Sequence, residues 1–230
     1  MPVSSAVPAL SQLAQRMREI DLTQRRWAAV HAGVASWAAT GVSQVDGSAL
    51  ADDRLRGPLL RSVLRRHLLD LDPGRAEALV ARSRETTTHF AWCLRDNADE
   101  PFTFWLHEYK PPADWRPGYA DSVHNHRYHF CTVILRGGYR HERYRTTTDP
   151  DTGLITAAAL TRRTECRAGD SGVLMAEEFH RIPHADEGTM TFLVKSRPVT
   201  RSSLSYDPAT GTGHRHVPVE ARLEELTRRI

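Results

Sequence analysis

The sequence has almost no lysine and no block of like charge. Only two of its 31 basic residues are lysines, Lys110 and Lys195, and the rest are arginines spread along the chain. With 28 acidic residues beside them, the formal net charge is +3. A nucleic-acid surface needs a dense basic stripe with interleaved aromatic side chains, and the sequence has none. We therefore expect solvated arginine faces and no nucleic-acid partner.

Cysteine and long apolar runs are also scarce. Cys93, Cys131 and Cys166 are odd in number and far apart, which indicates free thiols in a reducing compartment. The most apolar stretch, residues 27–42, contains His31 and is shorter than the roughly 20 residues that span a bilayer. The N-terminus lacks a charged region followed by an apolar one. The sequence therefore predicts no membrane segment, no secretory signal and a cytoplasmic location.

The chain of 230 residues, 40% hydrophobic and 26% charged, suffices for one substantial domain with an extension. Residues 1–85 have apolar residues at helical spacing and predict a packed helical extension. Its stripes are Leu10, Leu13, Met17 and Ile20; Trp27, Val30, Val34 and Trp37; and Leu59, Leu60, Val63, Leu64 and Leu68. A short fourth helix is expected after Asp72-Pro73-Gly74. Because these stripes cannot stay in water, we expect them to pack on the rest of the chain or at a homodimer interface.

Residues 86–216 change to a period-two pattern rich in aromatic, β-branched and threonine residues, with turn clusters between short runs. The expected strands are 87–95, 102–109, 129–136, 139–147, 154–166, 172–175, 189–197 and 199–206. Many short antiparallel strands favour a barrel or a sandwich. Residues 217–230 predict a closing amphipathic helix that starts at Pro218.

Five of the twelve histidines gather in two short segments: His124, His126, His129, His180 and His184. Clustered imidazoles beside strands indicate a metal site. Extended backbone would place His124 and His126 on one face, so both rings can reach one ion. His180 would complete a set of three nitrogens and leave other coordination positions open.

The spacing around these histidines resembles the two motifs of the cupin superfamily. Gly118, five residues, His124, one residue and His126, followed later by Gly138, match the first motif. Gly169, ten residues, His180, three residues and His184 match the second motif. The resemblance covers about residues 87–206. It implies a mainly β fold, a cupin barrel (double-stranded β-helix or jelly roll) over 86–216, with the helical extension before it and the helix after it.

Within the superfamily, the three-histidine set is similar to the thiol dioxygenases such as cysteine dioxygenase. Cys131 stands where many cupins have a carboxylate, and His-x-His, four residues, Cys, six residues and Gly is the pattern of that family. The resemblance implies ferrous iron, dioxygen and a small chelating substrate whose carboxylate Arg95 would hold. The family's cysteine is partnered by a tyrosine, and that position reads Lys195. We therefore expect a free Cys131 thiol that points into the barrel beside the metal.

Several further residues are candidates for the site. His129 and His184 would either hydrogen-bond a ligand or a carbonyl, or face the substrate as acid or base. Cys131 is a catalytic candidate with them. Tyr109 and Tyr128, near the first motif, are substrate-binding candidates together with Arg95, although ordinary loop packing would explain Tyr109 equally well.

The leading hypothesis is a mononuclear non-heme iron oxygenase that oxidises a small amino-acid-like or thiol metabolite with dioxygen. The expected cofactor is one divalent ion, Fe(II), with zinc, nickel or manganese as alternatives. A second hypothesis is a non-redox isomerase, lyase or cyclase that uses the same ion as a Lewis acid. A third is a ligand-binding sensor, but no helix-turn-helix pattern supports it.

Overall fold

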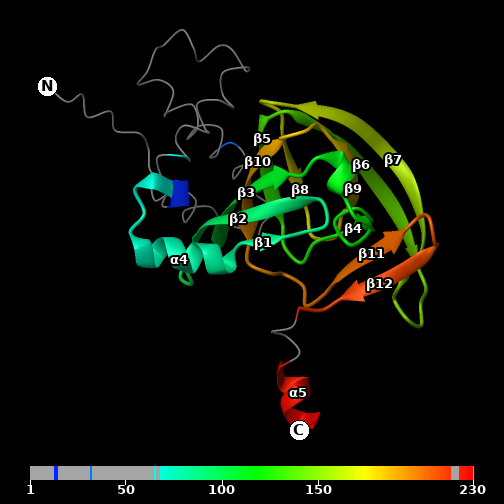
Figure 1. Cartoon of the computed structure of the whole chain (residues 1–230). Coiled ribbons are helices and arrows are strands. Elements are labelled where there is room, and N and C mark those ends of the chain that lie inside the picture. Colours follow the sequence, from blue (N-terminus) through cyan, green and yellow to red (C-terminus); the bar gives the residue numbers. More distant parts are fainter. Residues whose placement is uncertain (1–12, 15–31, 33–64, 66–67, 219–222, 230) are drawn as a thin grey trace, which may run out of the picture.

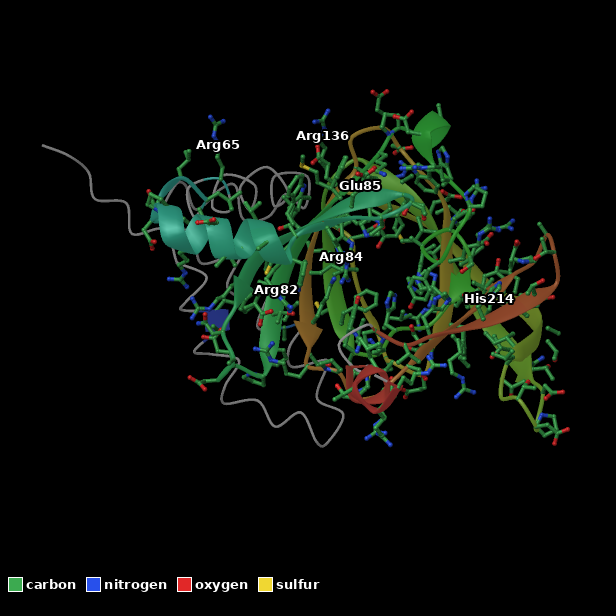
Figure 2. The ribbon with its side chains drawn as sticks, turned by 60° about the horizontal axis from the view of Figure 1, so that its bottom comes forward. Arg65, Arg82, Arg84, Glu85, Arg136 and His214 are labelled. Atoms are coloured by element: carbon green, nitrogen blue, oxygen red, sulfur yellow. The ribbon has the colours of Figure 1, made fainter. Side chains whose placement is uncertain are left out.

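The computed structural model describes residues 13–14, 32, 65, 68–218 and 223–229 (Figure 1). Most of the predicted helical extension lies outside these residues. The predicted fourth helix is confirmed as α4 (Pro73–Arg82). The Asp72 side chain caps it by accepting a hydrogen bond of 2.9 Å from the Arg75 backbone nitrogen. The chain then turns directly into strand, and Figure 2 shows Arg82, Arg84 and Glu85 in succession at this junction.

The strands of the barrel pair as one long antiparallel hairpin folded on itself. The innermost pair is β6 with β7, and around it β5 pairs with β8, β4 with β9, and β3 with β10. The bounds are β3 (Phe102–Tyr109), β4 (Val123–His124), β5 (Phe130–Arg136), β6 (Gly138–Thr148), β7 (Ile155–Arg167), β8 (Ser171–Leu174), β9 (Phe179–Ala185) and β10 (Met190–Ser196).

Successive segments of this hairpin alternate between two sheets. One sheet has the order β1-β2-β3-β10-β5-β8 and the other β12-β11-β4-β9-β6-β7. The outer strands are β1 (Arg84–Glu85), β2 (His89–Asp96), β11 (Ser203–Asp207) and β12 (Thr212–His216). This winding is that of a jelly roll, the double-stranded β-helix of the cupins. The predicted fold class is therefore confirmed.

Two of the motif glycines have direct structural reasons. Gly169 has φ +97° at the turn between β7 and β8, a conformation that side chains other than glycine rarely adopt. A Cβ on Gly138 would lie 2.6 Å from the Cys166 carbonyl oxygen, so any larger residue would separate β6 from β7. The spacing of these glycines therefore reports on the fold itself.

The sheet that contains β3, β5 and β10 is covered on both faces. Its outer face holds a buried apolar cluster: Leu94, Phe102, Phe104, Cys131, Leu135, Phe192 and Val194. Leu13 and Ala14 belong to this same cluster, so at these two residues the expected packing of the extension on the barrel is confirmed. Side chains alternate along a strand, and the intervening residues Thr132, Ile134, Thr191 and Leu193 therefore face inward. They line the cavity that holds the candidate site.

The strand that carries His180 was not predicted. β9 includes Pro183 and reads without a clear alternation, yet it pairs with β4 and β6 in the middle of its sheet. Helix α5 (Leu223–Arg229) lies within the predicted C-terminal helix. Among the described helices, none is long and apolar enough to cross a membrane.

Candidate metal centre

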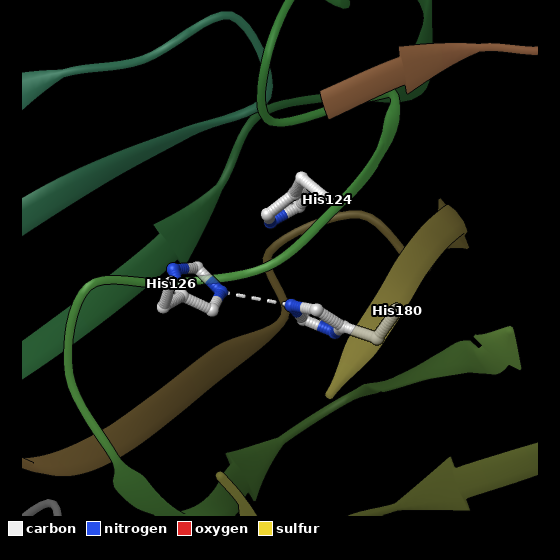
Figure 3. A group of neighbouring side chains, drawn as sticks. All are labelled: His124, His126 and His180. Carbon is white, nitrogen blue, oxygen red and sulfur yellow. Dashed lines mark hydrogen bonds between the residues drawn. The ribbon is translucent and has the colours of Figure 1, made fainter. Parts of the chain in front are cut away.

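The three predicted ligands come together from two elements (Figure 3). His124 ends β4 and pairs directly with His180 on β9, and His126 follows in the next loop. Asn125 between them is anchored to β11: its backbone nitrogen donates to the Leu204 carbonyl oxygen, and its side-chain oxygen accepts from the Leu204 nitrogen. This anchor fixes the backbone between His124 and His126.

The geometry of the three side chains fits one ion. Their ligand nitrogens lie within 4.8 Å of one another. The Nε2 atoms of His126 and His180 are 2.8 Å apart. Metal–nitrogen bonds of about 2.0–2.1 Å place two ligands of one ion about 2.9–3.4 Å apart, so small adjustments suffice. The three side chains could therefore hold a divalent metal.

Their protonation state suits the same role. Burial lowers the pKa of His124 to about 4 and holds the pKa values of His126 and His180 well below the ordinary value. The three rings are therefore neutral at pH 7 and offer lone pairs. The Nδ1 atom of His124 lies 2.9 Å from the Ser122 carbonyl oxygen. If that nitrogen carries the proton, Nε2 is free to bind metal.

The other nitrogen of His180 contacts a residue that the sequence did not single out. Nε2 of His141, on β6, is 3.1 Å from Nδ1 of His180. Burial, with a smaller effect from Arg143, lowers the pKa of His141 to about 4. A neutral His141 can accept a hydrogen bond from the Nδ1–H group of His180 and so direct Nε2 of His180 toward the ion. His141 is a lone histidine on a predicted strand, and only the pairing of β6 with β9 brings it to the site.

Substituting His141 by phenylalanine should weaken metal binding without abolishing it. We expect about a 10- to 100-fold loss of affinity, because the tautomer and orientation of His180 are no longer fixed. Competition against a chromogenic chelator measures this change. His214→Ala, on the exposed β12, is the matched control and should bind metal like the wild type. Unchanged affinity in His141→Phe would contradict the orienting role.

The three histidines lie in the wall of a cavity of about 220 Å³. His89 and His107 are two further imidazoles in this wall, and both are held neutral by burial, which lowers the pKa of His89 to about 3. The tyrosine and apolar lining includes Tyr109, Tyr128, Tyr139, Phe130, Ile134 and Leu193. Tyr109 and Tyr128, the two tyrosine candidates for substrate binding, both line this cavity, and Tyr128 stacks on His126 with 5.2 Å between ring centroids.

Two histidines predicted near the substrate are placed elsewhere. Nδ1 of His129 accepts a hydrogen bond of 2.9 Å from the Ala176 backbone nitrogen, and the residue is not among those that line the cavity. His184 is exposed, with Nε2 3.7 Å from Asp186 Oδ1. The register between β6 and β9 shifts between Arg140 and Glu142, so alternation does not carry from His180 to His184. Of the roles predicted for these two histidines, the structure is consistent with the structural, hydrogen-bonding role of His129.

The predicted orientation of Cys131 is wrong. Phe130 and Thr132 face the cavity, so Cys131 between them faces the outer cluster with Phe192 and Val194. Burial raises the pKa of its thiol to about 12, which makes it unreactive. Lys195 pairs with Phe130 rather than Cys131. We still expect a free Cys131 thiol, because side-chain alternation along β5 directs it away from the cavity.

Arg95 is also not placed to bind substrate. Its guanidinium makes two hydrogen bonds to Glu100, Nε to Oε2 at 2.8 Å and Nη2 to Oε1 at 2.5 Å. A register shift in the pairing of β2 with β3 precedes it, and it does not line the cavity. The prediction that Arg95 holds a substrate carboxylate is therefore wrong.

Cys131→Ser should destabilise the fold and leave metal binding intact. The hydroxyl would be buried among apolar side chains, where a polar group without a partner costs about 1–3 kcal/mol. Urea unfolding and metal titration measure the two effects. Cys131→Ala, which adds no polar group, should be the less destabilised variant. A serine variant with native stability and weakened metal binding would show that the thiol faces the site.

Lys195 on β10 is buried next to His107, a residue of the cavity wall. Its Nζ is 3.2 Å from Nε2 of His107 and lies 4.4 Å from the Trp105 ring centroid and 5.2 Å from that of Tyr128. Burial, reinforced by Arg84, holds its pKa well below the ordinary value. The resemblance to the thiol dioxygenases drew attention to Lys195 in the sequence, but only the tertiary structure shows its contact with His107 in the cavity wall.

Comparisons with known proteins give no assignment. No protein-family model matches the sequence, and no curated protein matches it. Among solved structures the chain is similar to the DMSP lyase DddQ from Ruegeria pomeroyi, with 12% identity and a TM-score of 0.36 over 56% of this chain and 62% of that one. It is also similar to oxalate decarboxylases from Bacillus subtilis (15% identity, TM-score 0.32, 51% of this chain, 28% of that one) and Lactobacillus farciminis (19%, 0.33, 51%, 31%). The chain spans less than two thirds of each, and at these scores the similarity says nothing about the reaction.

Proposed function

We propose that this protein is a metal-dependent enzyme in which one divalent ion, held by His124, His126 and His180, binds a small-molecule substrate. The observation that carries the proposal is the convergence of three neutral imidazoles on the wall of one cavity. Three nitrogen ligands leave positions open for substrate, which is typical of catalytic metal sites. The volume of about 220 Å³ limits the ligand to a small metabolite.

The chain supplies hydrogen-bonding groups around the site of the ion. The ion would act as a Lewis acid, and ferrous iron would add redox chemistry. Burial raises the pKa values of Tyr109 and Tyr128, so their hydroxyl groups stay protonated and can donate hydrogen bonds to substrate. His89 and His107 are neutral imidazoles that can form hydrogen bonds with a substrate.

These contacts favour a non-redox reaction, of the isomerase, lyase or cyclase type. Such a reaction needs a Lewis acid and groups that hydrogen-bond the substrate in one cavity, and the described residues provide sites for both. The features shared with the thiol dioxygenases do not support their reaction, because Cys131 faces away and Arg95 is held by Glu100. An Fe(II) oxygenase that acts on an amino-acid-like or thiol metabolite is the second candidate, because an all-histidine set with open positions also suits ferrous iron.

Metal dependence and oxygen uptake distinguish the two candidates. The protein is loaded in turn with zinc, nickel, manganese and ferrous iron, and each form is incubated in D2O with small metabolites. The non-redox proposal expects deuterium exchange or elimination, followed by NMR, with a redox-inert ion and no oxygen uptake. Oxygen uptake that requires ferrous iron and a thiol or amino acid would support the oxygenase instead. A protein that binds no divalent ion would overturn both.

A further inference from the structure

Three charged residues line one side of the cavity. Its charged lining residues are Arg143 on β6, Arg162 on β7 and Asp170 in the turn before β8. Asp170 is exposed, and its Oδ2 accepts a hydrogen bond of 2.8 Å from the Arg167 backbone nitrogen. Among the described lining residues there is no other acid. The charged lining therefore consists of two arginines and one aspartate.

The two arginines continue a row that starts at the metal centre. Arg143 pairs in register with His180 on one side and with Arg162 on the other. Directly opposite residues on antiparallel strands point to the same face, and neighbouring strands lie about 5 Å apart. Arg162 is therefore two strand spacings, about 10 Å, from His180 across the sheet. A small molecule can reach from one to the other.

The two arginines differ in their partners. Arg143 is held by an ion pair with Glu178 and by a hydrogen bond of 2.7 Å from Nη2 to the Val173 carbonyl oxygen. The neighbouring Arg163 is paired with Glu142 at 2.8 Å. Within the described part of the chain, no carboxylate is in ion-pair contact with Arg162, which lines the cavity with an exposed side chain. Arg162 is thus the arginine with a guanidinium available to a ligand.

A metal ion held by the three histidines would bring positive charge to the cavity. Three neutral histidines leave both charges of a divalent ion uncompensated, and the position after the first motif offers Cys131, which faces away. A charge in a partly buried site needs a counter-charge, and here the protein supplies none from the ligands. An anionic substrate would provide it.

We propose that Arg162 binds a carboxylate of the substrate, and that the substrate is a small carboxylic acid with a second polar group directed at the metal centre. This inference rests on the proposed function. The guanidinium fork matches a carboxylate with two parallel hydrogen bonds. A phosphate dianion would need further donors, and Arg143, the nearest, is already engaged by Glu178.

The test compares two probes of nearly the same size, the anionic 3-mercaptopropionate and the neutral 3-mercaptopropionamide, whose thiol can bind zinc. Affinities for the zinc-loaded full chain are measured by calorimetry. We expect the carboxylate to bind more tightly than the amide. Arg162→Gln should weaken carboxylate binding about 10- to 100-fold and leave amide binding unchanged, because a hydrogen bond to a charged group is lost only with the acid. Arg167→Gln, an exposed arginine on the same strand outside the cavity lining, is the control and should behave like the wild type.

The outcomes distinguish a failure of this inference from a failure of the proposed function. Zinc content is measured first, and a wild-type chain that takes up no zinc overturns the proposed function and this inference with it. A zinc-loaded chain that binds acid and amide equally, or loses both equally in Arg162→Gln, overturns the inference alone. Inorganic phosphate that competes at lower concentration than the carboxylate, in an Arg162-dependent manner, would overturn the assignment to carboxylic acids.

Discussion

Replacing His180 by alanine is expected to abolish stoichiometric metal binding while the barrel stays folded. His180 is buried at the centre of its sheet and lies between His126 on one side and His141 on the other. Its loss removes one of three ligand nitrogens, so affinity should fall by well over about 100-fold, more than for a residue that only orients a ligand. Metal content after desalting and circular dichroism give the two measurements.

The same result is expected for His124→Ala and His126→Ala. The variants should remain folded, because the apolar clusters on the sheet that contains β3 and β10 do not include these histidines. His184→Ala removes an exposed imidazole from the same strand as His180 and should retain full metal content. If any of the three ligand variants keeps full occupancy, the ligand assignment is wrong.

The second large effect is a loss of stability of the metal-free protein in acid. Burial lowers the pKa of His89 to about 3 and holds that of His107 well below its usual range. In the unfolded chain both titrate near 6.5, so below that pH the unfolded state binds protons that the folded state does not. The contribution of these two histidines to stability should therefore be constant above about pH 7 and fall as the pH drops below 6.5. At pH 5 the loss is about 2 kcal/mol for His89 alone.

Urea unfolding in the presence of a chelator, at pH 7 and pH 5, measures this loss. His89→Phe should reduce the difference between the two pH values, because the substituted residue does not titrate. His184→Ala changes an exposed side chain and should keep the wild-type difference. A wild-type free energy of unfolding that is equal at pH 7 and pH 5 would contradict the neutral burial of these imidazoles.

The sequence alone was enough for the fold class, for most of the strands and for the three candidate ligands. These features depend on local patterns: alternation along strands, turn residues between them, and glycines at positions where a side chain would collide or where φ is positive. Gly138 and Gly169 are examples, because the close approach of β6 to β7 and the turn before β8 each require glycine. His124 and His126 were predictable because they are two residues apart in one extended segment.

The orientation of the other candidates was decided by the tertiary structure. Alternation cannot be carried from His126 to Cys131, because the irregular segment between β4 and β5 separates them, and the thiol faces the outer cluster. A shift in the register of β6 and β9 likewise prevents alternation from being carried from His180 to His184. Arg95 is held outside the pocket by an ion pair with Glu100, and a strand pattern in the sequence does not reveal such a pair.

His141, Arg143 and Arg162 reached the site only through the pairing of β6 with β7 and β9. Their positions follow from contacts between residues of different strands that are 18 to 39 positions apart in sequence, as in the Thr161–Arg143 and His141–His180 hydrogen bonds. A motif records the residues that one segment presents. Which residues of other segments share that face depends on register, and register is set when the apolar faces of whole strands are buried together.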